Sequence, residues 1–266
     1  MWPVTDCIEA VDVWAANLTP QVTGTFDTAG LLAAHPNIEI IIARMYGGDS
    51  GPDRTYSEVV HSPGVKVEPY LVVSPNKNMT AMFTAWDAQL GTSRPKVIWA
   101  DCERKDGMGV DFVTGYIQDV IAEARRRWIW AKIGIYTGAW IWDGMVRHGW
   151  EGDIPLWDGH YLWEKMLTPT TGEQYHTFEP LIARLPIGNS FTPLIPLGWK
   201  GVATPVVWQF SDQGSLPPVP RKIDLNLVNR TWYASVYGSG PVVPPVEPLT
   251  VEVRYPHGVQ VVATEV

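Results

Sequence analysis

Short apolar runs alternate along the chain with longer amphipathic segments. Apolar residues recur at helical spacing most clearly over residues 110–127, where Val113, Ile117 and Val120 fall on one face. Weaker helical patterns cover residues 80–90 and 139–147. Eight short runs rich in Val, Ile and aromatic residues predict strands at residues 8–13, 38–43, 65–73, 97–101, 133–136, 154–157, 205–210 and 222–225.

Alternation of strands with helices is typical of parallel sheets, and eight such strands predict an α/β fold, a closed β/α barrel. A doubly wound open sheet is the alternative. The helical periodicity fades after about residue 150, and residues 168–200 are rich in Pro and Gly. We therefore expect a modified, irregular barrel of about eight strands, with fewer helices over the last three.

The C-terminal part has a different pattern. Residues 238–248 form a Gly/Pro/Val stretch typical of a semi-rigid linker, and residues 249–254 and 259–264 flank a Tyr-Pro-His-Gly turn, which predicts a β-hairpin. The predicted division is a barrel over 1–237, a linker over 238–248 and a hairpin extension over 249–266. An isolated hairpin is marginal in water. It must dock on the barrel, self-associate with another chain, or begin a longer segment.

Composition and charge narrow the function. Of 266 residues 45% are hydrophobic and 18% charged, which allows a sizeable core. The net charge of −8 argues against nucleic acid as a partner, because nucleic-acid binding needs a basic face. The start of the chain has no basic and apolar leader, and no run approaches membrane-spanning length. We expect no membrane partner, and export by another route or with a leader that this sequence lacks.

Asp101 and Glu103 carry the strongest chemical signal. They follow an apolar strand and are separated by one residue, so both point to the same face. Two neighbouring carboxylates are unfavourable to bury, and a fold usually accepts them where a site uses them. Cys102, between them, should face the opposite way as a buried and inert thiol. With Cys7 it makes neither a disulfide framework nor a metal-binding spacing.

In a β/α barrel, residues at the carboxyl ends of the strands share one mouth. No His occurs among these strand ends and no Gly-rich phosphate loop follows the first strand, so we expect no metal and no cofactor. Acids surrounded by aromatic rings suit glycoside hydrolysis, in which one carboxyl protonates the leaving oxygen. The predicted mouth residues are Asp12, Arg44, Tyr46, Tyr70, Asp101, Glu103, Tyr136, Trp157, Tyr161, Trp208, Gln209 and Asp224.

Ordered motifs add a family resemblance. Asp12-Val13, Asp101-Cys102-Glu103, Ile135-Tyr136-Thr137-Gly138, Leu156-Trp157-Asp158-Gly159-His160-Tyr161, Trp208-Gln209-Phe210 and Asp224-Leu225-Asn226 resemble the motifs of glycoside hydrolase family 25. This family comprises the Chalaropsis-type lysozymes, which are common among phage endolysins and bacterial autolysins. The resemblance spans about residues 8 to 232.

The resemblance implies a muramidase that cleaves the β-1,4 bond between N-acetylmuramic acid and N-acetylglucosamine in peptidoglycan, at the bacterial cell wall. It implies that Glu103 is the general acid and that Asp101 assists the substrate's acetamido group as internal nucleophile, with retention. Asp12 and Asp224 complete the acidic floor. The resemblance also implies that the saccharide is bound by Tyr136, Trp157, Tyr161, Trp208, Gln209, Tyr70 and Tyr46. Without a leader, the expected route to the wall is phage-encoded release from the host cytoplasm or processed export.

Other interpretations stay open at this point. Asp12 and Asp224 could satisfy local backbone groups, Trp157 and Trp208 could belong to the core, and Tyr46 replaces the Glu that the family usually carries. One alternative is a non-catalytic saccharide-binding or virion structural protein with the same fold. Another is a glycosidase that acts on a different N-acetylated polysaccharide.

Overall fold

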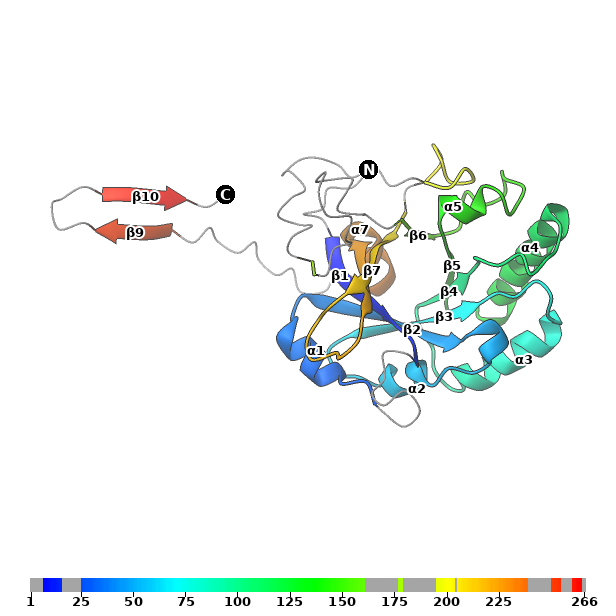
Figure 1. The fold of residues 1–266 in the computed structure, drawn as a ribbon, viewed down its shortest axis with the longest axis horizontal. Coiled ribbons are helices and arrows are strands. Elements are labelled where there is room, and N and C mark those ends of the chain that lie inside the picture. Colours follow the sequence, from blue (N-terminus) through cyan, green and yellow to red (C-terminus); the bar gives the residue numbers. More distant parts are fainter. Residues whose placement is uncertain are drawn as a thin grey trace.

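Eight strands close into a barrel in the order of the sequence, as predicted (Figure 1). The computed structural model describes residues 7–15, 25–160, 177–178, 195–203 and 205–238, and the backbone of residues 250–254 and 260–264. Each barrel strand overlaps its predicted range. The strands are β1 (Cys7–Val13), β2 (Ile38–Tyr46), β3 (Lys66–Val72), β4 (Val97–Asp101), β5 (Lys132–Thr137), β6 (Leu156–Gly159), β7 (Val207–Gly214) and β8 (Ile223–Asn229).

The direction of β8 corrects the expectation of an all-parallel barrel. Strands β1 to β7 run parallel, but β8 is antiparallel to both β7 and β1. Only residues 215–222 join β7 to β8, and a parallel crossover needs a dozen or more residues. The first residues of β8 therefore lie at the same end of the barrel as the last residues of β1 to β7.

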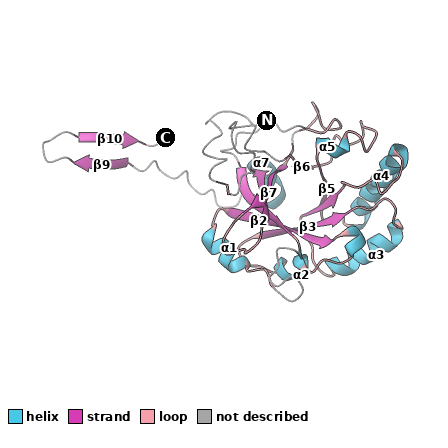
Figure 2. Ribbon diagram, viewed as in Figure 1, coloured by secondary structure: helices cyan, strands magenta, loops and turns pink. Residues whose placement is uncertain are grey.

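The helices lie mainly outside the first half of the barrel (Figures 1 and 2). Helix α2 packs on β2 and β3, α3 on β2, and α4 on β5. The helix expected over 139–147 ends at Trp142. Further along, the carboxylate of Glu151 accepts hydrogen bonds from the backbone N–H groups of Gly149 and Trp150. The helices are α1 (Thr28–Ala34), α2 (Thr55–Val59), α3 (Met79–Leu90), α4 (Val110–Arg127), α5 (Ala139–Trp142) and α7 (Arg230–Tyr237).

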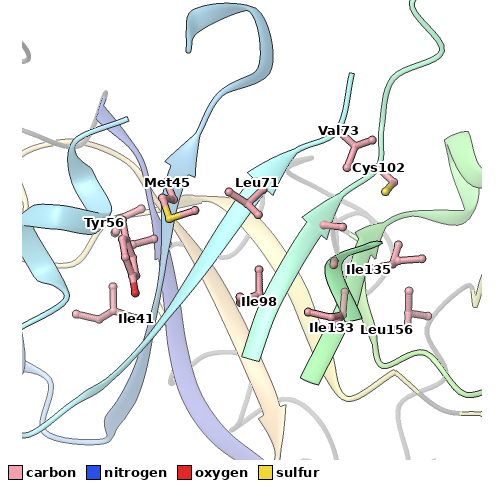
Figure 3. Packing of buried hydrophobic residues seen from close by; sticks show 14 of the residues in the cluster. Ile41, Met45, Tyr56, Leu71, Val73, Ile98, Cys102, Ile133, Ile135 and Leu156 are labelled. Carbon is pink, nitrogen blue, oxygen red and sulfur yellow. The ribbon is translucent and has the colours of Figure 1, made fainter. Parts of the chain in front are cut away.

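Side-chain alternation along the strands separates two apolar layers. The outer layer fills the space between strands and helices, and Figure 3 shows part of it. In β4, Ile98 and Ala100 face this layer, and so does Cys102 just beyond the strand. The thiol is 1% exposed and burial raises its pKa well above the usual value, which confirms the predicted inert cysteine. The inner layer fills the barrel and contains Ile40, Ile42, Val97, Trp99, Val207 and Val228.

Helix α7 closes the end of the barrel opposite the strand carboxyl ends. Its Trp232 ring lies 5.9 Å from the ring of Trp99, and the Tyr237 hydroxyl donates a 2.5 Å hydrogen bond to the Glu68 carboxyl group inside the barrel. The Trp99 indole N–H donates to the same carboxyl group at 2.6 Å. Burial raises the pKa of Glu68 to about 7. These contacts of α7 plug this end of the barrel.

The C-terminal hairpin consists of β9 (Thr250–Arg254) and β10 (Gln260–Thr264), which pair antiparallel in a two-stranded sheet. Their bounds agree with the predicted strands. The predicted linker lies almost wholly outside the described residues, as does most of the Pro- and Gly-rich segment over 168–200. Among the described helices, none combines the length and the apolar character that crossing a bilayer requires.

Candidate active site

A pocket of about 320 Å³ opens at the carboxyl ends of the parallel strands. Its walls come from β1, β2, β3, β4, β5, β6, β7 and β8, so the closed barrel gathers residues that are far apart in sequence. The lining residues are Asp12, Trp14, Arg44, Tyr70, Asp101, Glu103, Tyr136, Trp157, Gln209, Asp212 and Asp224.

Asp101 and Glu103 both face this pocket, on the side of β4 opposite Cys102. One carboxylate oxygen of each, Asp101 Oδ1 and Glu103 Oε1, is buried without a hydrogen-bond partner in the described part of the chain. Burial, followed by the charges of Asp101 and Asp224, raises the pKa of Glu103 to about 8. Burial raises the pKa of Asp101 to about 7, against the lowering effect of Arg44 and Arg104. Near neutral pH, Glu103 therefore holds a proton and Asp101 is close to its ionisation point.

Asp12 and Asp224 form a second acidic pair. They are direct partners in the antiparallel register of β1 and β8, and their carboxyl groups are hydrogen-bonded to each other. Burial and then the charge of Asp224 raise the pKa of Asp12 well above its ordinary value. Burial raises the pKa of Asp224 to about 6, while hydrogen bonds from Asp12 and Gln209 lower it. The hydrogen bond between the two carboxyl groups raises the pKa of Asp12 and lowers that of Asp224.

An amide connects the acids to the aromatic floor. Asn226 Nδ2 donates to Asp12 Oδ2 at 3.0 Å, and Asn226 Oδ1 accepts from the Trp157 indole N–H at 2.8 Å. The Trp157 ring packs 4.4 Å from the ring of Tyr136 and 5.9 Å from that of Tyr70. All three aromatic residues are at least nine-tenths buried. Trp157 is thus both a core residue and the floor of the pocket.

Sequence reasoning missed an arrangement around Arg44. Arg44 Nε donates a 2.6 Å hydrogen bond to Asp53 Oδ2, and the guanidinium lies 4.4 Å from the centre of the Trp14 ring. Asp53, in the loop before α2, is 5% exposed and also accepts from the Thr55 hydroxyl at 2.6 Å. Asp53 does not directly follow a predicted strand, so the sequence pattern gives no reason to place it near the site. Its contact with Arg44 in the structure places it there. These contacts fix the one guanidinium that lines the pocket.

Asp212 was also missed, because it lies beyond the predicted end of the seventh strand. Strand β7 continues to Gly214, with register irregularities against β8 after Gln209 and after Ser211. These irregularities bring Asp212 to the pocket, where its charge raises the pKa of Asp224.

Two predicted saccharide-binding residues do not reach the pocket. A register irregularity in β2 between Arg44 and Tyr46 turns Tyr46 outward, where its ring lies 6.4 Å from that of Trp86. Trp208 alternates with Val207 and Gln209, faces the outer layer and donates from its indole N–H to the His160 carbonyl oxygen at 2.7 Å. Neither ring is therefore among the residues that line the pocket. Tyr161 lies outside the described residues.

The acidic residues do not form a metal centre. Among the described residues, no group of three or more His, Cys, Asp or Glu side chains is arranged to hold a metal ion. The described residues that line the pocket supply carboxyl groups, a guanidinium, an amide, and phenol and indole rings.

Comparison with solved structures places the fold. The chain is similar to the bacterial lysozyme of Streptomyces coelicolor, with a TM-score of 0.63 and 18% identity over 88% of this chain and 98% of that one. It is also similar to a family 25 glycosyl hydrolase of Bacillus anthracis, with a TM-score of 0.59 and 14% identity over 83% and 88% of the two chains. The chain has the glycosyl hydrolase family 25 fold.

A further structure of this family 25 fold is the catalytic domain of an endolysin from a bacteriophage of Listeria monocytogenes, with a TM-score of 0.54 and 17% identity over 88% of this chain and 98% of that one. No protein-family model and no curated protein matches the chain. The fold that the ordered motifs implied is confirmed, although the sequences have diverged widely. Tyr46 lies outside the pocket that Asp12, Asp101, Glu103 and Asp224 line.

Proposed function

We propose that this protein is a glycoside hydrolase of the bacterial cell wall, a muramidase that cleaves the β-1,4 bond between N-acetylmuramic acid and N-acetylglucosamine. The observation that carries the proposal is the pocket itself. It combines a protonated Glu103, the titrating Asp101 and the pair Asp12 and Asp224 over an aromatic floor. This pocket occupies the open end of a fold whose solved examples include lysozymes and endolysins.

In the proposed reaction Glu103 donates its proton to the glycosidic oxygen, and the bond from that oxygen to the anomeric carbon breaks. The acetamido oxygen of the substrate attacks the anomeric carbon from the opposite face and forms a cyclic intermediate. Asp101, as the anion, orients the acetamido group and stabilises its developing positive charge. Water then opens the intermediate while the Glu103 carboxylate takes its proton, so the configuration is retained.

In this scheme Asp12 and Asp224 are the acidic pair that lies beside Glu103 and Asp101 in the pocket. After burial and the charge of Asp101, the charge of Asp224 raises the pKa of Glu103 further. The hydrogen bond from Asp12 lowers the pKa of Asp224 and so favours its charged form. Tyr70, Tyr136 and Trp157 supply the flat apolar surface on which a sugar ring can pack.

The decisive experiment is a digest of purified peptidoglycan, analysed by mass spectrometry after borohydride reduction. New reduced muramic acid ends identify a muramidase, whereas reduced glucosamine ends would identify cleavage of the other glycosidic bond. No new reducing ends with the parent protein, together with retained binding to the wall, would establish the non-catalytic saccharide-binding alternative. Release of reducing ends from chitin at a rate above that from peptidoglycan would support the other polysaccharide.

A further inference from the structure

A second pocket, of about 310 Å³, lies at the opposite end of the barrel. Lys66 is the first residue of β3 and Lys96 directly precedes β4, whereas Asp101 is the last residue of β4. Five residues of strand span roughly 15 Å, so the two pockets are separated by the length of the barrel. The pocket is formed by the start of β3, the segment before β4, helix α2 and the end of α7.

The charge of this pocket differs from that of the chain. Lys66, Arg94, Lys96 and His61 line it, and no Asp or Glu does, although the net charge of the protein is −8. Elsewhere the basic side chains commonly pair with acids, as Arg126 does with Glu123 at 2.6 Å.

Within the described ranges, no ion pair with a carboxylate involves Lys66, Arg94 or Lys96. Three like charges around one hollow repel one another unless an anion lies between them.

The cations sit on a preorganised frame. Arg94 Nη1 donates to the Ser93 carbonyl oxygen at 2.8 Å, and its guanidinium lies 4.3 Å from the centre of the Trp130 ring. Lys66 Nζ lies 5.9 Å from the centre of the Tyr237 ring, and that ring is fixed by its hydroxyl hydrogen bond to buried Glu68. A guanidinium held in this way loses less conformational entropy on binding an anion than an unrestrained one, whereas Lys66 and Lys96 are exposed side chains that supply charge.

We propose that this pocket binds the phosphate groups of an anionic polyol-phosphate polymer. Arginine and lysine together suit phosphate, because the first supplies a planar fork of donors and the second a compact charge. The pocket wall also has apolar parts, formed by Val60, Val65 and Pro95. These parts suit the carbon chain that links successive phosphates of such a polymer. The site stands on its own geometry, and only its use in bringing the enzyme to cell walls rests on the proposed function.

A polymer of the bacterial cell wall suits this second pocket better than a soluble anion does, because the two pockets face opposite ends of the barrel. A polymer held at Lys66 and Lys96 leaves the acidic pocket free for a glycan strand. The overall negative charge would otherwise keep the protein away from an anionic wall. A local basic pocket resolves this conflict without adding cations near Glu103.

The test is isothermal titration calorimetry with the full chain and a synthetic poly(glycerol phosphate) oligomer, with inorganic phosphate as the free-anion probe. The triple variant Lys66→Gln, Arg94→Gln, Lys96→Gln should bind the oligomer at least tenfold more weakly than the parent. A matched control, Arg125→Gln, Arg147→Gln, Lys200→Gln, removes the same charge from exposed positions elsewhere and should stay within twofold. Circular dichroism verifies folding, and Lys96→Glu serves as a single exposed substitution if the triple variant unfolds.

Several outcomes would overturn the site. An equal loss in both triple variants would mean that net charge alone attracts the polymer, and no binding by the parent would remove the proposal outright. Inorganic phosphate bound as tightly as the oligomer would make the ligand a free anion, and pocket-dependent binding to phosphatidylglycerol vesicles but not to the oligomer would make it a lipid headgroup. The Glu103→Gln variant should keep full oligomer binding, so failure of the proposed catalysis and failure of this site are separate results.

Discussion

Asp12 and Asp224 face each other directly across β1 and β8 with their carboxyl groups hydrogen-bonded, and Asn226 Nδ2 lies 3.0 Å from Asp12 Oδ2. The pair exists because β8 runs antiparallel, which places the start of that strand beside the end of β1. Two buried acids in contact destabilise the fold when both ionise. This acidic pair therefore lowers the stability of the fold while it supports the proposed catalysis.

We expect Asp224→Asn to stabilise the protein above about pH 6 and to slow catalysis. The folded pKa of Asp224, about 6, lies above its unfolded value, so the folded state binds more protons and loses stability as pH rises from about 4 to 6. An amide has no such loss. The gain should be on the order of 1 kcal/mol, or about 2–4 °C in Tm, measured by thermal unfolding at pH 4 and pH 7. Asp119→Asn, at an exposed position of α4, is the control and should leave Tm unchanged.

Replacing Glu103 by Gln should abolish lysis with little effect on stability near pH 4. Loss of the general acid should lower the release of reducing ends by at least about 100-fold. The folded pKa of Glu103, about 8, lies above its unfolded value, so the parent loses stability as pH rises from about 4 to about 8, whereas the amide does not titrate. At pH 9 the buried Glu103 carboxylate of the parent is ionised and destabilises the fold, so the variant should have the higher Tm. Parent-like turbidity loss by the variant would remove Glu103 from the acid role.

Arg44 should determine the pH at which kcat/KM falls on the acidic side of its pH profile. If Asp101 acts as the anion and Glu103 as the acid, kcat/KM should be bell-shaped with its maximum between about 7 and about 8. Arg44 lowers the pKa of Asp101, so Arg44→Gln should move the acidic limb to higher pH. Arg44→Lys keeps the charge and should restore most of the limb. A variant profile that superimposes on the parent would show that Arg44 has only a structural role.

Two tyrosines provide a matched comparison of pocket and outer layer. Tyr136→Phe removes a hydroxyl from the pocket wall and should lower kcat/KM about tenfold. Tyr46→Phe removes a hydroxyl from a ring that packs on Trp86 and should stay within twofold of the parent. Kinetics on a soluble peptidoglycan fragment would measure both. A large effect at Tyr46 with none at Tyr136 would reverse the placement of the two rings relative to the substrate.

The sequence determined much of the fold because strand alternation is a local property. The apolar runs predicted all eight barrel strands, and the spacing of Asp101 and Glu103 around Cys102 assigned each of the three side chains to its correct face. Helix α4 was predicted at its observed bounds, because its apolar stripe repeats over five turns of sequence.

Tertiary structure decided what depends on relations between strands. The reversal of β8 brought Asp224 to the mouth from the start of its strand, a position from which a parallel strand would have carried it to the opposite end. Register irregularities in β2 and β7 removed Tyr46 from the pocket and added Asp212. A pattern of apolar and polar residues fixes which face a side chain takes within a regular strand. It does not encode strand direction or a shift in register, because those follow from loop length and from packing against neighbours distant in sequence.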